Sequence, residues 1–285
     1  MIQSMTGYGK AVTELSQKKV TVEIKTLNSK NLDLNVRVPS AYREKELEIR
    51  SKLSQQLLRG KVDFSIYVES TGSETTSTIN QDVVNSYIDQ LRSVTEVSSE
   101  SLLEIAMRLP DVLKTEREEF DETEWAEIDK TIDEAIDEVK GFREDEGAVL
   151  AHDFTIRIKN IQQLSEEVIE LDEERLANVR ERIEKAVADL KQNVDENRFE
   201  QELMYYLEKL DITEEKVRLK NHLDYFLQAL LSKDSNGKKL GFICQEIGRE
   251  INTTGSKSNF APMQKVVVQM KDELEKIKEQ LLNVL

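Results

Sequence analysis

A stretch of helical periodicity between residues 125 and 187 constrains the fold of this 285-residue chain more than any other feature. Apolar residues recur there every three or four positions, from Trp125 through Ile156 to Val187, and charged residues fill the positions between them. This spacing places the apolar side chains on one face of a helix. We therefore predict long helices packed together as an arm or hairpin, with Gly141 and Gly147 as candidate interruptions.

The first seventy residues carry the signal of strands instead. Three runs, at 20–25, 32–38 and 62–68, alternate apolar and polar residues as half-buried strands do. Between the last two runs, residues 41–58 have helical spacing. We predict an antiparallel sheet with one helix packed on it.

These patterns divide the chain into three regions and predict an α+β fold. Residues 1–70 form an α+β region, residues 71–200 form a mostly helical acidic arm that begins in a polar stretch at 70–78, and residues 201–285 form a helical C-terminal region. In the last region we expect helices at about 213–231, 239–251 and 264–285, with a turn at 252–258.

The net charge of −16 argues at first sight against binding of nucleic acid, but its distribution weakens that objection. Residues 1–70 carry 12 Lys and Arg against 8 Asp and Glu, and residues 201–285 carry 13 of each kind. The middle region holds the other 15 basic and 35 acidic residues, so it supplies the whole acidic excess. The two ends can therefore bind a polyanion while the middle keeps the chain in solution.

The N-terminus and the hydropathy indicate a cytoplasmic protein without a membrane partner. Residues 1–10 lack the basic and apolar segments of a signal peptide, and no apolar run approaches the roughly 18 residues of a membrane span. The single cysteine, Cys244, excludes an intramolecular disulfide and lies among apolar neighbours, which favours inert packing over catalysis. The motifs GxxxxGK, GxGxxG, HExxH and GxSxG do not occur.

Two C-terminal helices place acidic residues beside their apolar faces. On a helical wheel, Glu215 and His222 fall at the border of the apolar stripe of one helix, and Glu246 and Glu250 fall at the border of the stripe of the next. If the helices pack antiparallel, the four side chains converge into an imidazole and carboxylate site. That ligand set suits Mn²⁺ or Zn²⁺ better than Mg²⁺, which prefers oxygen ligands.

Arg218 and Arg249 can hold phosphate oxygens beside such a site. A simpler interpretation is that Glu214 pairs with Arg218, that Glu246 pairs with Arg249, and that His222 is a structural residue at the edge of a core. Spacing alone favours the simpler interpretation.

Motifs along the whole chain resemble one protein family. They are IQSMTGYGKA and VEIKTLNSKNLDL near the N-terminus, REDEGAVLAHDF in the middle, and DITEEKVRLKNHLDYF and GKKLGFICQEIGREINTTGSKS near the C-terminus. These segments resemble the YicC/YloC family. The resemblance implies a stress-associated, cytoplasmic bacterial protein that acts as a divalent-metal-dependent endoribonuclease and assembles into a hexameric ring with helical arms.

The resemblance also implies roles for particular residues. The candidate catalytic residues are Glu246, Glu250, His222 and Arg249, and the candidate metal ligands are Glu215, His222, Glu246 and Glu250. Under this hypothesis they hold one or two Mn²⁺ or Mg²⁺ ions that activate water for attack on an RNA phosphodiester, while Arg249 or Lys257 steadies the phosphate.

We also expect contacts with RNA on the N-terminal side of the chain. The candidate RNA-binding residues are Asn28, Lys30, Arg37, Arg59 and Lys61 at or beside strand ends, with Arg218 and Lys257 from the C-terminal helices. Solvated charges at a sheet edge are the alternative interpretation of the N-terminal group. If six subunits close a ring, weakly positive faces add into one lining, and binding should weaken steeply with salt.

Two other functions remain open at this stage. A non-enzymatic adaptor ring that binds RNA or a ribonuclease explains the long helical arms equally well, although it does not need acids at the helix borders. A metal-dependent phosphoesterase that acts on small nucleotides shares the site chemistry but has no use for a basic ring. A metal-free cleavage through the 2′-OH, with His222 as the acid–base group, is a further route.

Overall fold

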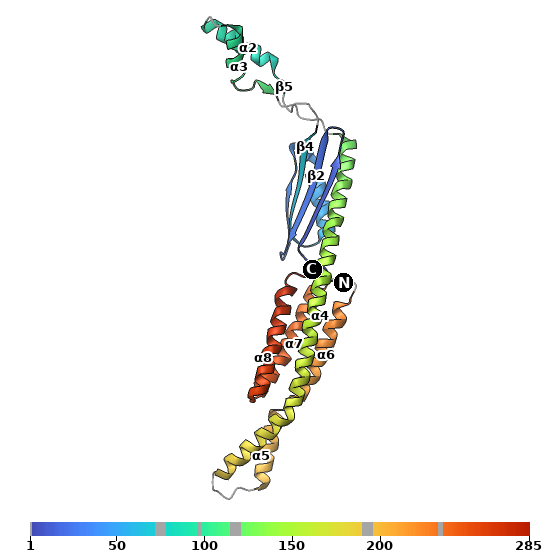
Figure 1. Ribbon diagram of the computed structural model, residues 1–285, viewed down its shortest axis with the longest axis vertical. Helices are drawn as coiled ribbons and strands as arrows, with labels where there is room; N and C mark the ends of the chain where they lie inside the picture. Colours follow the sequence, from blue (N-terminus) through green and yellow to red (C-terminus); the bar gives the residue numbers. More distant parts are fainter. Residues whose placement is uncertain (1, 72–77, 96–97, 115–120, 190–195, 233–235) are drawn as a thin grey trace.

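The computed structural model describes residues 2–71, 78–95, 98–114, 121–189, 196–232 and 236–285. A small helical tip, a four-stranded sheet and a bundle of helices follow one another along a narrow, elongated molecule (Figure 1). Helix α4 (Glu122–Asp189) runs beside both the sheet and the bundle. The predicted α+β class is confirmed.

The four-stranded sheet is mixed, so the prediction of a wholly antiparallel sheet is wrong at one edge. Its strand order is β1 (Gly7–Glu14), β2 (Lys18–Leu27), β4 (Gly60–Ser70) and β3 (Leu32–Arg37). The first two pairs are antiparallel, but β3 and β4 are parallel. A 3₁₀ turn (Ser40–Lys45) and helix α1 (Glu46–Leu57) connect β3 to β4 as a crossover, and such a connection brings the second strand in parallel to the first.

Strand β1 escaped prediction because its inward-facing positions carry almost no side chain. Gly7, Gly9 and Ala11 are its buried residues, while the residues between them are exposed. Helix α4 lies so close to this strand that a Cβ atom on Gly9 would come within 2.2 Å of the carbonyl oxygen of Ala135. The glycines therefore let the helix pack directly against the strand backbone.

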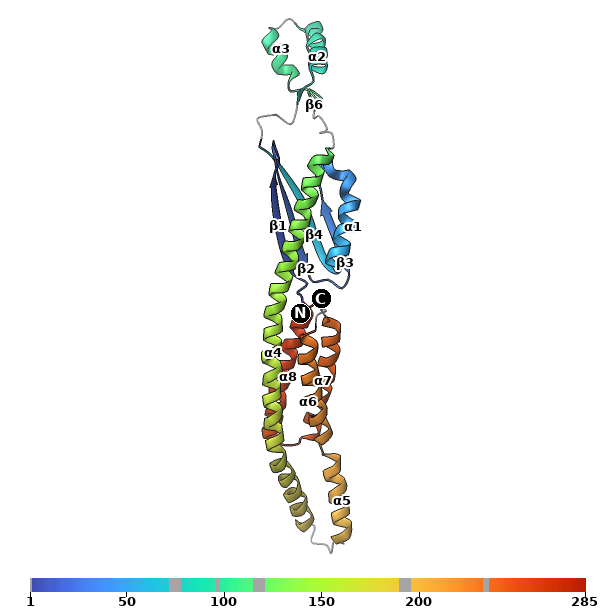
Figure 2. The ribbon, with the colours of Figure 1, turned by 90° about the vertical axis from the view of Figure 1, so that its right-hand side faces the viewer.

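Helices α1 and α4 cover one face of the sheet (Figure 2). Ile24 and Phe64 from the strands pack there against Leu53 of α1 and Ile132 of α4. The other face of the sheet is open to solvent, with Tyr67 about half exposed. This difference between the faces produces the alternation of apolar and polar residues that identified three of the strands.

Helix α4 is continuous over 68 residues, so neither of the two glycines interrupts it. Nothing lies within 4 Å of a Cβ atom on Gly141, whereas a Cβ atom on Gly147 would lie 2.1 Å from the carbonyl oxygen of Ile2. Gly147 thus lets the N-terminal segment cross the helix. Helix α5 (Glu196–Lys209) lies beside the far end of α4 (Figure 1).

The bundle consists of the second half of α4 together with α6 (Thr213–Leu230), α7 (Gly237–Lys257) and α8 (Ala261–Leu281). The predicted turn at 252–258 is wrong, because α7 continues to Lys257. Thr253 donates its hydroxyl to the Arg249 carbonyl at 3.0 Å, so the polar side chain is satisfied within the helix and does not end it. Thr254 is only 3% exposed and extends the buried stripe of α7.

The tip is a small unit between β4 and α4. It contains α2 (Gln81–Val94), α3 (Ser99–Ala106) and a two-stranded pair of β5 (Thr78–Ile79) and β6 (Leu113–Lys114). Its buried apolar residues among those described are Val84, Leu102, Ala106 and Val112. Most of the polar stretch predicted at 70–78 lies outside the described residues.

The two ends of the chain meet where the sheet joins the bundle (Figure 1). Leu285 donates its backbone N–H to the Gln3 carbonyl at 2.9 Å, and Met5 donates to the Asn283 carbonyl at 2.7 Å. These bonds tie the sheet to the end of α8. Among the helices of the described residues, none combines the length and the apolar character that a membrane span requires.

Cys244 should be chemically inert in the folded protein. Its side chain is fully buried in the bundle core, and burial raises the pKa of the thiol to about 12, because desolvation penalises the thiolate. The reactive thiolate is therefore almost absent at pH 8. We expect a thiol reagent at pH 8 to modify the protein only after denaturation, and rapid modification of the native chain would contradict this packing.

Candidate metal centre

Helices α6 and α7 pack against each other in antiparallel directions. Residues with higher numbers on α6 meet residues with lower numbers on α7, as three contacts indicate: Glu215 with Lys257, His222 with Glu246 and Glu250, and Tyr225 with Lys239. Buried apolar side chains such as Leu223 and Ile247 belong to the core that the two helices share. The sequence prediction depended on this orientation, and the structure has it.

Three of the four predicted metal ligands converge at the border of this helix pair. One ligand atom each from His222, Glu246 and Glu250 lies within 4.8 Å of the other two. Glu246 and Glu250 are one turn apart on α7, and His222 reaches them from α6. The group therefore offers one imidazole nitrogen and two carboxylate oxygens to a single point, which is the kind of donor set that binds a divalent cation.

Glu250 is the residue of this group whose negative charge is the most costly to leave without a partner. The residue is 4% exposed, and within the described part of the chain its carboxylate has neither a hydrogen-bond donor nor an ion-pair partner. A buried carboxylate beside a second carboxylate is costly unless a cation or a donor compensates it. A divalent cation between His222, Glu246 and Glu250 satisfies that requirement, so these residues fit a bound metal.

Glu215, the fourth predicted ligand, is not part of this group. It lies two turns before His222 on α6, about 10 Å away along the helix axis. It is buried, and its Oε1 accepts a hydrogen bond from Nζ of Lys257 at 2.8 Å. Lys257 also donates to the Asp211 carbonyl at 2.8 Å. The structure therefore places Glu215 and Lys257 in a pair with each other at the far end of α7.

A buried ionic cluster adjoins this pair and was not predicted. Arg175 of α4 is 1% exposed, forms an ion pair with Asp172 at 2.7 Å, and donates to the Lys257 carbonyl at 3.2 Å. Asp172 also pairs with Lys216 of α6. The cluster fastens α4 to the end of the α6–α7 pair. In the sequence, Asp172 and Arg175 look like one more pair on a solvated acidic helix.

The two candidate phosphate-binding arginines lie on the exposed side of the helix pair. Arg249 is 72% exposed, and its guanidinium is 4.0 Å from Glu246, so it reaches the edge of the group of three. Arg218 is one turn before His222 and pairs with Glu214 at 2.5 Å, with half of its side chain exposed. Both salt bridges of the simpler sequence interpretation therefore exist, yet both are weak surface pairs that a phosphate can displace.

The N-terminal candidates for RNA binding are in two different situations. Asn28 donates to the Leu282 carbonyl at 2.7 Å, and Arg59 donates to the Ser29 carbonyl at 3.0 Å, so both hold the protein's own backbone. Lys30, Arg37 and Lys61 are exposed. The contact of Asn28 with the end of α8 places Asn28 at the junction of sheet and bundle, roughly 20 Å along α7 from Glu250. Arg37 lies farther from the junction, because it ends β3 and pairs with Ser65 of β4.

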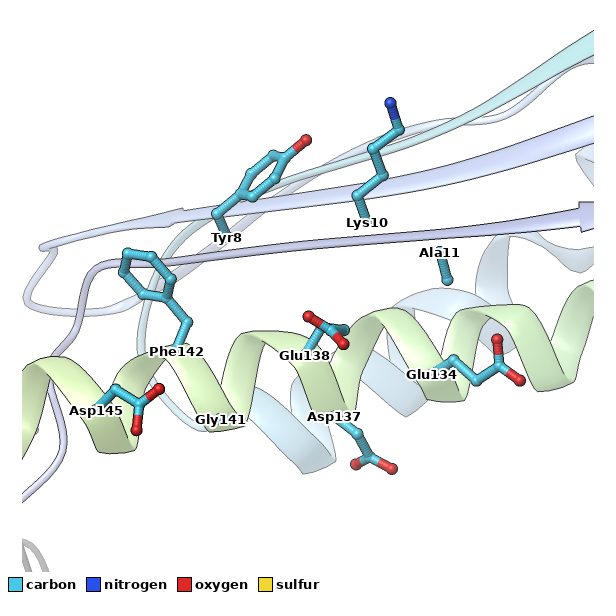
Figure 3. Close-up of a pocket in the computed structure, with 9 residues that line it drawn as sticks. All are labelled: Tyr8, Lys10, Ala11, Glu134, Asp137, Glu138, Gly141, Phe142 and Asp145. Carbon is cyan, nitrogen blue, oxygen red and sulfur yellow. The ribbon is translucent and has the colours of Figure 1, made fainter.

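An open groove of about 740 Å³ lies elsewhere, between β1 and α4 (Figure 3). Tyr8 and Lys10 line it from the strand, and Phe142 lines it from the helix. Four carboxylates also face it: Glu134, Asp137, Glu138 and Asp145. Because this balance of charge repels a polyanion, the groove is a poor site for a nucleic acid.

Comparison with known proteins identifies the family. Residues 2–152 match the family model described as "Endoribonuclease YicC-like, N-terminal region", and residues 159–285 match "Endoribonuclease YicC-like, C-terminal". A relative from Clostridioides difficile strain 630, named "Probable endoribonuclease YicC", is 32% identical over the full length of both chains. One of the same name from Haemophilus influenzae is 27% identical, also over the full length of both. The chain thus belongs to the YicC-like endoribonuclease family.

Proposed function

We propose that this endoribonuclease uses a divalent metal ion held by His222, Glu246 and Glu250 to hydrolyse phosphodiester bonds in RNA. The observation that carries the proposal is the convergence of these three side chains, one of which, Glu250, is a buried residue. One imidazole and two carboxylates favour Mn²⁺, while Mg²⁺ is a weaker fit because it prefers oxygen ligands and retains its water. Three protein ligands also leave coordination positions for water and substrate.

The residues around the site supply charge and position. A divalent cation there contributes Lewis acidity, which stabilises charge on a phosphoryl oxygen and favours the ionisation of water. Glu246 and Glu250 balance the charge of the cation, and His222 fixes its place between the two helices. Arg249 and Arg218 can exchange their exposed carboxylate partners for phosphates on the same side, where a guanidinium forms two hydrogen bonds with one phosphate group.

Metal dependence tests the proposal directly. We expect the purified protein to cut a labelled structured RNA with Mn²⁺, to cut it more slowly with Mg²⁺, and to leave it intact in EDTA. His222→Ala prepared by the same route should need at least about tenfold more Mn²⁺, because one ligand is lost. Cleavage that persists in EDTA would instead support a metal-free reaction through the 2′-OH.

The two alternative functions give different results in the same assay. An adaptor leaves RNA intact under all metal conditions, although it binds it. A phosphoesterase for small nucleotides loses its cleavage of RNA when a mononucleotide is added in excess. The convergence of the acids at the border of a buried helix pair counts against the adaptor, which has no need of them there. The phosphoesterase shares this site, so only the competition experiment separates it from the proposed function.

We further propose that RNA is held by exposed cations along the β3–β4 edge of the sheet and that the chain forms a hexamer. Lys30, Arg37 and Lys61 are the better candidates for these contacts, because Asn28 and Arg59 already bond to the protein backbone. Charge reversal of the three exposed residues should weaken the binding of RNA in EDTA and make its affinity less dependent on salt concentration.

The hexamer is tested by light scattering of the purified protein, which should give the mass of six chains. The mass of a single chain would contradict the proposed ring.

A further inference from the structure

Two aromatic side chains that lie next to the group of three along α6 and α7 are exposed. Phe242 lies one turn before Glu246 on α7 and is 68% exposed. Tyr225 lies three residues after His222 on α6 and is 45% exposed. Among the described residues, Phe242 is the most exposed phenylalanine. An exposed ring of this kind beside a catalytic group is a sign of an interaction surface.

Both rings point to the same side of the helix pair as the group of three. With 100° per residue, Phe242 falls about 40° from Glu246 and about 145° from the centre of the buried stripe of α7. Tyr225 falls about 60° from His222 and about 130° from the centre of the buried stripe of α6. Neither ring therefore lies in the apolar core between the two helices, although the Tyr225 ring contacts Lys239 of α7.

Cations lie on the same side as these rings. Nζ of Lys239 lies 5.0 Å from the centroid of the Tyr225 ring, and Arg249, which is 72% exposed, lies one turn beyond Glu246 and two turns beyond Phe242 on α7. Exposed aromatic rings interleaved with cations are the arrangement that binds single-stranded nucleic acid, since bases stack on the rings and phosphates pair with the cations.

We propose that Phe242 and Tyr225 form a stacking surface for unpaired bases of RNA, so that the centre acts on single-stranded segments. The inference rests on the proposed function for the position of the cut, because it places the stacked base next to the phosphate that faces His222, Glu246 and Glu250. A base inside a duplex stacks on its own neighbours and does not offer its face to Phe242. A structured RNA is therefore cut in loops and single-stranded ends.

RNA affinity measured in EDTA, where metal-dependent cleavage does not occur, tests the stacking surface independently of the metal centre. The probes are a fluorescent single-stranded oligoribonucleotide and a blunt duplex that contains the same sequence. We expect Phe242→Ala and Tyr225→Ala each to weaken single-strand binding by about tenfold and to leave duplex binding unchanged. Phe242→Trp should keep single-strand affinity, since it keeps a ring. Val217→Ala is the matched control, because Val217 is 56% exposed on α6 on a different side.

Each result bears on the proposal. If single-strand binding by Phe242→Ala and Tyr225→Ala equals that of the wild type while metal-dependent cleavage is intact, the stacking surface is wrong and the metal centre stands. If the variants lose binding but the wild type never cuts, the stacking surface stands and the metal centre is wrong. A drop in chain association in Phe242→Ala, with unchanged RNA binding, would assign the ring to a contact between copies and overturn the proposal.

Discussion

The double substitution Glu246→Gln/Glu250→Gln is expected to abolish metal-dependent cleavage while making the metal-free protein more stable. Glutamine keeps the shape of glutamate but is a poor metal ligand and carries no charge. The loss of two of three ligands should lower cleavage by more than about 100-fold, since changes in groups that merely orient a ligand already cost 10- to 100-fold. Folding survives, because neither side chain holds another element in place.

The gain in stability follows from the surroundings of Glu250. The residue is 4% exposed, and its carboxylate lacks a donor among the described residues and lies in one group with Glu246. Without metal, the Glu250 carboxylate has no donor and lies beside a second carboxylate, that of the half-exposed Glu246. Removal of the two charges should therefore raise the free energy of unfolding by about 1 kcal/mol. For a chain of this length that corresponds to a rise of roughly 2 °C in the melting temperature.

Thermal melts with and without Mn²⁺ measure both effects. At a hundredfold excess over its dissociation constant, Mn²⁺ should stabilise the wild type by about 2.7 kcal/mol and the variant not at all. The matched control is Glu181→Gln/Glu184→Gln, which removes two exposed charges of α4 that pair within their own helix. It should leave the response to Mn²⁺ unchanged. A variant that cuts RNA, or that is destabilised without metal, would contradict the assignment.

The convergence of His222, Glu246 and Glu250 could be predicted from the sequence, because it depends mainly on which face of its helix each side chain occupies. The positions of His222, Glu246 and Glu250 at stripe borders were enough once the two helices packed antiparallel. Glu215 satisfies the same wheel but lies two turns away along the axis. A wheel discards that axial distance, so the partner of Glu215, which is Lys257, could not be read from periodicity.

The differences in the fold have equally local causes. Alternation of apolar and polar residues reports strands only where the inward side chains are apolar, and in β1 two of the inward positions are glycine. The parallel edge arises because α1 intervenes between β3 and β4, and pairing direction is a property of the connection, not of either strand. At the end of α7, the Thr and Ser residues predict a turn. In the structure, the hydroxyls of Thr253 and Ser256 instead donate to carbonyls of the same helix.

Gly147→Ala is expected to destabilise the fold by about 2 kcal/mol, although the same change at Gly141 should stabilise it. Both glycines lie inside α4, where alanine is favoured by up to about 1 kcal/mol. A Cβ atom on Gly141 meets nothing within 4 Å, so that site gains the full helix preference. A Cβ atom on Gly147 would lie 2.1 Å from the Ile2 oxygen and 2.9 Å from the Ile2 carbonyl carbon, which is backbone that cannot rotate away.

The segment that crosses Gly147 is held from both sides, so the clash cannot be relieved cheaply. Ser4 donates to the Arg143 carbonyl at 3.0 Å, the Gln3 carbonyl accepts from Leu285, and Ile2 is 1% exposed. Displacing the segment costs about 3 kcal/mol as overpacking, which exceeds the helix preference. Urea unfolding curves of Gly147→Ala, Gly141→Ala and wild type should therefore have midpoints on opposite sides of the wild type. Shifts in the same direction would mean that the segment does not lie against α4 in solution.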